Sequence, residues 1–91
     1  MSPKPLMSMT DPAAFATPVA TLDTLGLYCP VPIIKTARRI REIATGEVLE
    51  VLSDDPVILV DMPAWCASNG HEYIGADRSG RQVRLLIRRL H

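Results

Sequence analysis

Hydrophobic and polar positions alternate most regularly near the end of the chain, over residues 82–88. Val83, Leu85 and Ile87 fall on one face of an extended segment, and the positions between them fall on the other. This period of two predicts a strand. The other predicted strands are residues 19–25, where the alternation is imperfect, 47–53 and 71–77. Arg78-Ser79-Gly80 predicts a short hairpin connection before the last strand.

A helical spacing separates the first two predicted strands. Ile33, Ala37, Ile40 and Ala44 recur at intervals that place them on one face, which predicts a helix over residues 30–43. Gly46 follows it as a stop signal.

A second helical segment is predicted between residues 57 and 68. The stretch Asp54-Asp55-Pro56 is expected to supply an N-cap carboxylate, and Asp61 a second cap. Met62 and Trp65 are expected to anchor the segment in the core. Pro63 should kink the helix or make it restart, because proline inside a helix removes a backbone hydrogen bond.

The resulting order is strand, helix, strand, helix, strand, strand. It predicts an α/β two-layer sandwich, with two helices packed on one face of a four-stranded mixed sheet. Residues 19–91 would form this single domain. Residues 1–18 hold four of the eight prolines without a strand or helix period, and are expected to form a flexible N-terminal tail.

Composition excludes several functions. Ten basic and ten acidic residues give a formal charge of zero, which argues against a non-specific nucleic-acid binder. The N-terminus lacks the continuous apolar stretch of a signal peptide, and no segment approaches the length of a membrane span. Two cysteines do not make a disulfide framework. We therefore expect a cytoplasmic protein with reduced thiols and no membrane partner.

The candidate site is the stretch from Gly26 to Pro32, where a glycine turn leads through Cys29 into the first helix. Pro30 and Pro32 suit the first turn of a helix and would stiffen it. This arrangement predicts an exposed Cys29 thiol at the helix N-terminus. Backbone N–H groups there, with the helix dipole, would lower the pKa of the thiol. Such a Cys29 could be catalytic; otherwise it is a small core residue.

Three further interpretations concern the surroundings of Cys29. Asp23 either orders the turn by accepting backbone N–H bonds or is an ordinary solvated carboxylate. Cys66, inside the second helical segment, is expected to pack in the core and not to pair with Cys29. No Cys-x-x-Cys pair is present, and Cys29 has no neighbouring Cys or His that would suggest a metal site.

The first predicted helix carries a basic face. Lys35, Arg38 and Arg39 could dock an acidic partner close to Cys29. Alternatively they form a solvated helix face, which is the commoner role of such charges.

Several motifs together resemble those of the small TusA/SirA-like sulfur carrier proteins. The matching positions, in chain order, are Leu22-Asp23, Gly26-Leu27, Cys29-Pro30-x-Pro32, Lys35, Gly46, Asp54-Asp55-Pro56, Asp61-x-Pro63, Cys66, Gly70-His71 and Leu86-Ile87-Arg88. The resemblance covers residues 22–90 and implies the same two-layer fold.

The resemblance also implies a function. Cys29 would accept a sulfane sulfur as a persulfide, from a cysteine desulfurase or a rhodanese-type donor, and relay it to an acceptor protein. Thiolation of tRNA, molybdenum-cofactor synthesis and other sulfur metabolism are the implied destinations. The family implies no metal or organic cofactor, and no direct nucleic-acid binding is expected. Two alternatives remain open: a regulatory or interaction module, and an RNA-binding domain of the same fold.

Overall fold

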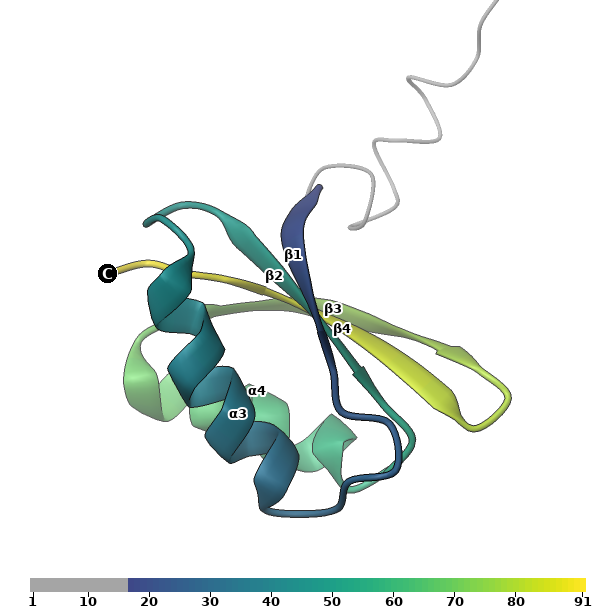
Figure 1. The fold of residues 1–91 in the computed structure, drawn as a ribbon. Coiled ribbons are helices and arrows are strands. Elements are labelled where there is room, and N and C mark those ends of the chain that lie inside the picture. The colour runs from purple at the N-terminus through teal and green to yellow at the C-terminus, as the bar shows by residue number, and fades with distance from the viewer. Residues whose placement is uncertain (1–16) are drawn as a thin grey trace, which may run out of the picture.

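The computed structural model describes residues 17–91, so residues 1–16 of the tail predicted over residues 1–18 lie outside the described residues. Pro18 belongs to the first strand and not to the tail. Residues 17–91 form four strands, two α-helices and one 3₁₀ turn (Figure 1). In order these are β1 (Pro18–Asp23), α3 (Val31–Arg39), the 3₁₀ turn η1 (Ile40–Glu42), β2 (Val48–Ser53), α4 (Ile58–Asn69), β3 (Glu72–Ser79) and β4 (Gln82–Arg88). Both helices lie on one face of the sheet, which confirms the predicted two-layer sandwich.

The strands are arranged in the order β1-β2-β4-β3, and the sheet is mixed. β1 and β2 are parallel, whereas β4 is antiparallel to both β2 and β3. Parallel neighbours end at the same edge of a sheet. The loop that follows β1 and the loop that follows β2 therefore lie side by side, at the end where α3 begins (Figure 1).

The core fills the space between the helices and the covered face of the sheet. Val83, Leu85 and Ile87 are fully buried there, as the alternation in β4 predicts. Opposite them α4 contributes Met62 and Cys66, which are 0% and 1% exposed. Burying these apolar side chains is the main favourable contribution to folding.

The other face of the sheet combines ion pairs with a small apolar cluster, in which Ile74 packs against the buried side chains of Val48 and Leu86. Arg84 bridges Glu50 at 3.0 Å and Asp77 at 2.7 Å, and Arg88 pairs with Glu72 at 2.9 Å. These contacts cross from strand to strand. The charge of both arginines is thus compensated on the face that the helices leave open.

The first helix buries a different stripe from the predicted one. Pro32, Thr36 and Ile40 point into the core, whereas Ala44 is exposed and follows the 3₁₀ turn. Thr36 is tolerated there because its hydroxyl donates a hydrogen bond of 2.8 Å to the Pro32 carbonyl. The prediction therefore located the helix but was shifted in its choice of buried positions.

The predicted interruption of the second helix is wrong, because α4 continues through Pro63. The helix carries Met62 and Cys66, one turn apart, into the core. Their burial outweighs the hydrogen bond that proline removes. Gly70 ends the helix in the left-handed conformation with φ 73°, where the N–H of Gly70 is directed to the Cys66 carbonyl.

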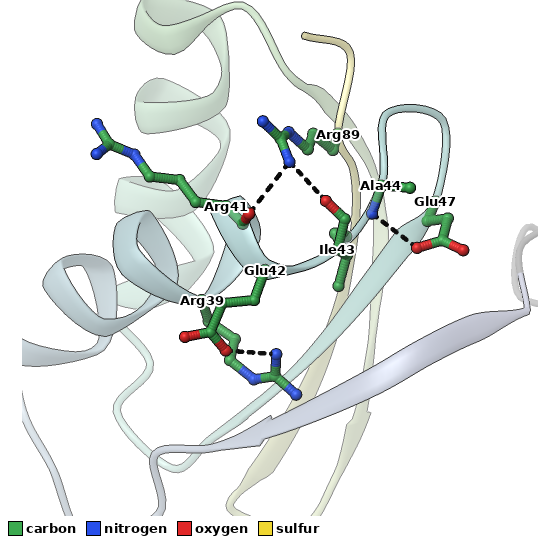
Figure 2. A network of polar contacts seen from close by, with 7 residues as sticks. All are labelled: Arg39, Arg41, Glu42, Ile43, Ala44, Glu47 and Arg89. Atoms are coloured by element: carbon green, nitrogen blue, oxygen red, sulfur yellow. Dashed lines mark hydrogen bonds and ion pairs between the residues drawn. The ribbon is translucent and has the colours of Figure 1, made fainter.

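The far end of the α3–η1 segment is tied to the chain after β4. Figure 2 shows the Arg89 guanidinium between the carbonyls of Arg41 and Ile43. Its Nη1 donates to both, at 3.2 Å and 2.5 Å. A cation at a helix C-terminus satisfies carbonyls that have no partner within the helix. No helix within residues 17–91 is long and apolar enough to cross a membrane.

Replacing Met62 by alanine should destabilise the fold by about 2–5 kcal/mol, since it removes a fully buried side chain from the contact between α4 and the sheet. Val60→Ala on the same helix is the matched control. Val60 is 72% exposed, and its loss should cost less than about 0.5 kcal/mol. Urea unfolding followed by circular dichroism measures the free energy of unfolding of both variants. Similar decreases for the two would contradict the placement of Met62 in the core.

Candidate functional site

Cys29 lies in the loop between β1 and α3, immediately before the helix. Its thiol is exposed, as predicted. Pro30 is the N-cap residue, so the first helical position follows it directly at Val31. The loop runs beside the β2–α4 loop, which carries Asp54 and Asp55.

A nearly buried carboxylate, Asp55, joins these two loops. Its Oδ2 accepts the N–H of Cys29 at 3.0 Å, and its Oδ1 accepts the N–H of Val57 at 3.1 Å. The N–H of Asp55 in turn donates to the Ser53 hydroxyl at 3.1 Å. Sequence analysis placed a capping carboxylate in the stretch Asp54-Asp55-Pro56. In the structure Asp55, 8% exposed, supplies this hydrogen bond just before α4.

Two other carboxylates order the turn before Cys29. Asp23 accepts the N–H of Leu25 at 2.9 Å, which favours the first of the two interpretations left open for it. Asp54 accepts the N–H of Gly26 at 3.1 Å. Gly26 has φ 81°, a left-handed conformation that favours glycine. Thr24, which sequence analysis missed, is fully buried, and its hydroxyl donates to the Leu52 carbonyl at 2.6 Å.

Contrary to the prediction, the N–H groups at the N-terminus of α3 do not point at the Cys29 sulfur. The N–H of Val31 donates to the Tyr28 carbonyl at 2.9 Å, and that of Ile33 to the Pro30 carbonyl at 3.1 Å. No side chain caps the helix. Pro32 is buried against the core while Pro30 is exposed, so only Pro32 anchors the start of the helix.

The sulfur instead contacts a carboxylate of the second helix. Sγ of Cys29 donates a hydrogen bond to Oδ2 of Asp61 at 3.1 Å. This hydrogen bond, some desolvation, and the negative charges of Asp61 and Asp55 raise the pKa of the Cys29 thiol. The prediction of a lowered pKa is therefore wrong: nearby carboxylates disfavour the thiolate, and the N–H groups that would favour it already have carbonyl partners.

Asp61 is the residue of this site that sequence analysis assigned to another role. It was interpreted as a cap for a restarting helix, but it lies in the first turn of a continuous α4. Its separation from Cys29 in the sequence hides the contact. The signal that would have found it is the parallel β1–β2 pair, which brings the starts of both helices to one edge.

Cys66 plays the structural role predicted for it. It is 1% exposed in the core, and burial raises the pKa of its thiol to about 11. Both cysteines are free thiols. A buried thiol with such a pKa is almost entirely protonated at neutral pH, so it is a poor nucleophile.

The predicted docking residues differ in their availability. Lys35 and Arg38 are exposed on α3. Arg39 is half-buried and pairs with Glu42 at 2.8 Å, which Figure 2 shows. Its charge is thus partly compensated. Within residues 17–91, no three Cys, His, Asp or Glu side chains form a group that could hold a metal ion.

Comparison with known proteins identifies the class of protein. The family described as "Sulfurtransferase TusA" matches residues 20–89. YrkF of Bacillus subtilis (strain 168), whose name assigns it a sulfur-carrier role, is 43% identical over 68 residues. That match covers 75% of this chain but only 37% of the relative, so the chain spans little more than a third of YrkF.

The crystal structure of the SirA-like protein from Desulfitobacterium hafniense has the same fold. It superposes with a TM-score of 0.70 at 21% identity, covering 80% of this chain and all of that protein. The chain belongs to the TusA family.

The pKa of Cys29 can be read from the pH dependence of alkylation by iodoacetamide. We expect a midpoint above the ordinary cysteine value of about 8.5, since two carboxylates disfavour the thiolate. Added salt should lower this midpoint, because it screens their charges. A Cys66→Ala background leaves one thiol to report. A midpoint below the ordinary value, rising with salt, would instead indicate stabilisation by positive charge.

Asp55→Ala should destabilise the protein by about 2–4 kcal/mol, because it leaves the N–H groups of Cys29 and Val57 without their shared acceptor. Asp54→Ala is the control, since it removes one longer hydrogen bond from a less buried carboxylate and should cost about 1 kcal/mol or less. Denaturant unfolding measures the difference. Equal losses would mean that Asp55 does not hold the two loops together.

Proposed function

We propose that this protein is a sulfur carrier in which Cys29 accepts a sulfane sulfur as a persulfide and passes it to an acceptor protein. The observation that supports this role best is the exposed Cys29 thiol at the start of α3. Its backbone is fixed by a nearly buried carboxylate, while its side chain stays accessible. Membership of the TusA family supports the same reading.

The transfer needs only thiol exchange chemistry. The thiolate of Cys29 attacks the terminal sulfur of a persulfide on the donor protein, and a new bond forms between that sulfur and Sγ. The donor's own sulfur–sulfur bond breaks, and its electron pair leaves on the donor cysteine. Delivery repeats the exchange, with an acceptor thiolate attacking the terminal sulfur carried by Cys29. No net oxidation occurs, so neither step needs a cofactor.

The donor and acceptor would dock around the start of α3. Three apolar side chains spaced three residues apart are exposed there: Tyr28 (64%), Val31 (37%) and Ile34 (49%). Exposed apolar side chains that lie together on a surface are typical of an interaction site. Lys35 and Arg38 lie on the same helix and add positive charge. We propose that this surface receives proteins with a complementary apolar and acidic patch. Arg39 would contribute less, because Glu42 already pairs with it.

A cysteine desulfurase or a rhodanese-type protein is the proposed donor, and thiolation of tRNA is one proposed destination of the sulfur. Two free cysteines suit a reducing compartment, so we propose that the carrier works in the cytoplasm. Direct binding to RNA is not part of this proposal. Arg84 and Arg88, the arginines of the open sheet face, are engaged by carboxylates.

Cys29→Ser should abolish sulfur loading, since serine cannot form a persulfide, whereas Cys66→Ala should retain it because Cys66 is buried. Each protein is incubated with a cysteine desulfurase and cysteine, or with a rhodanese-type protein and its sulfur donor, and intact mass spectrometry then detects the added sulfur atom. Peptide mapping locates it.

The two variants control for each other. Cys29→Ser should keep the wild-type unfolding midpoint, because it changes an exposed side chain. If Cys66→Ala loses loading as completely as Cys29→Ser while remaining folded, both cysteines take part in the transfer. If wild-type protein gains no sulfur from either class of donor, an interaction module without sulfur transfer becomes the better reading.

A further inference from the structure

The contact between Cys29 and Asp61 depends on the thiol proton, which an empty carrier has on Sγ and a sulfur-loaded carrier lacks. The carboxylate of Asp61 accepts the proton-bearing Sγ at 3.1 Å. It comes from the first turn of α4, and the loop that presents Cys29 is bonded to Asp55 just before that helix. The Cys29 backbone is thus held where its side chain can reach the Asp61 carboxylate.

The charged groups that act on this sulfur are both acidic. Asp61 reaches it from α4, and Asp55 from the β2–α4 loop. On α3 the nearest basic side chain in sequence is Lys35, which is exposed and one turn beyond the start of the helix. Sγ therefore lies in a negative environment, which stabilises a neutral thiol and disfavours an anion.

We propose that Asp61 is a positioning residue that distinguishes the empty carrier from the loaded one: it binds the Cys29 thiol through its proton and releases the side chain when a sulfur atom takes the place of that proton. This inference rests on the proposed sulfur-carrier function. It assigns to Asp61 a role in the regulation of the same site.

The loading step explains the change. As the bond between Sγ and the incoming sulfur forms, the donor persulfide's sulfur–sulfur bond breaks and its electron pair leaves on the donor cysteine. The proton of the Cys29 thiol passes to the Asp61 carboxylate, which is within hydrogen-bond distance, and from there to solvent or to the leaving thiolate. Loaded Sγ then has no hydrogen to donate.

The loaded side chain is no longer attracted to α4. Asp61 returns to its carboxylate form, and an ionised terminal sulfur beside it is repelled by like charge. The persulfide should therefore turn outward, toward the exposed side chains of Tyr28 and Val31, where an acceptor thiol would approach. The empty thiol, in contrast, stays protonated and reacts slowly with oxidants and electrophiles.

Three Asp61 variants on the Cys66→Ala background separate charge from hydrogen bonding. Asp61→Asn removes the charge but keeps an oxygen acceptor, Asp61→Ala removes both, and Asp61→Glu keeps the charge. Asp77→Asn removes a carboxylate from the open face, where Asp77 pairs with Arg84. The first measurement is the rate of iodoacetamide alkylation of the empty carrier at pH 7.5.

For the empty carrier we expect Asp61→Ala to speed alkylation several-fold, because loss of the hydrogen bond and of the neighbouring negative charge lowers the thiol pKa. Asp61→Asn should give a smaller increase, Asp61→Glu should stay closest to wild type among the three, and Asp77→Asn should change nothing. Circular dichroism confirms folding. If folded Asp61→Ala and Asp61→Asn alkylate at the wild-type rate, Asp61 does not hold the thiol and the proposal is wrong.

The second measurement uses the carrier loaded with sulfur, and follows release of the terminal sulfur to cyanide. In wild type the loaded form should react at least as fast as in Asp61→Ala, because repulsion from Asp61 exposes the terminal sulfur. A loaded form that reacts several-fold faster in Asp61→Ala would show that the carboxylate holds the persulfide as well, which would overturn the proposed discrimination.

These results are separable from the proposed function. Alkylation of the empty carrier involves no sulfur donor, so the Asp61 contact can be verified even if Cys29 never gains sulfur. Conversely, if the protein loads sulfur normally and its alkylation rate does not depend on Asp61, the proposed function stands and the role assigned to Asp61 is wrong.

Discussion

The arrangement of the site depends on one nearly buried carboxylate. A carboxylate that leaves water must recover its hydrogen bonds within the protein. Asp55 does so by accepting the N–H groups of Cys29 and Val57, which belong to different loops. Because the β1–β2 pair is parallel, both loops leave the sheet at the same edge. The hydrogen bonds of Asp55 convert this proximity into a fixed geometry and set how far the Cys29 sulfur lies from α4.

Much of the fold was predictable because its signals are local. The alternation in β4 predicts the fully buried positions Val83, Leu85 and Ile87, and Pro30 and Pro32 mark the start of α3. Interruption of α4 at Pro63 was predicted from the same kind of local rule and is wrong. A rule about proline describes the helix alone, whereas α4 is held by the burial of Met62 and Cys66 against the sheet.

The site was predictable only in part for a related reason. Cys29 stands out because glycine, thiol and prolines occur together in a short stretch. The chemical environment of Cys29 does not stand out in the sequence, because Asp61 contacts the sulfur from the second helix. The expectation of a lowered pKa counted the helix N-terminus and, as a smaller effect, the positive charges of Lys35 and Arg38. Those N–H groups donate to carbonyls of Tyr28 and Pro30. The hydrogen bond to the Asp61 carboxylate is then the largest influence on the pKa of the Cys29 thiol, and it raises that pKa. Predicting the pKa of the Cys29 thiol therefore required the tertiary structure.

A raised pKa would also suit the proposed sulfur carrier between transfers. A permanently ionised, exposed cysteine would be open to oxidation whenever it is empty. An exposed thiol beside a carboxylate is less reactive until a partner protein covers it. Docking over Tyr28 and Val31 would exclude water and could bring a basic group close to the sulfur, which would shift the balance toward thiolate. Activation would then belong to the complex, so that the carrier's reactivity is confined to its correct partners.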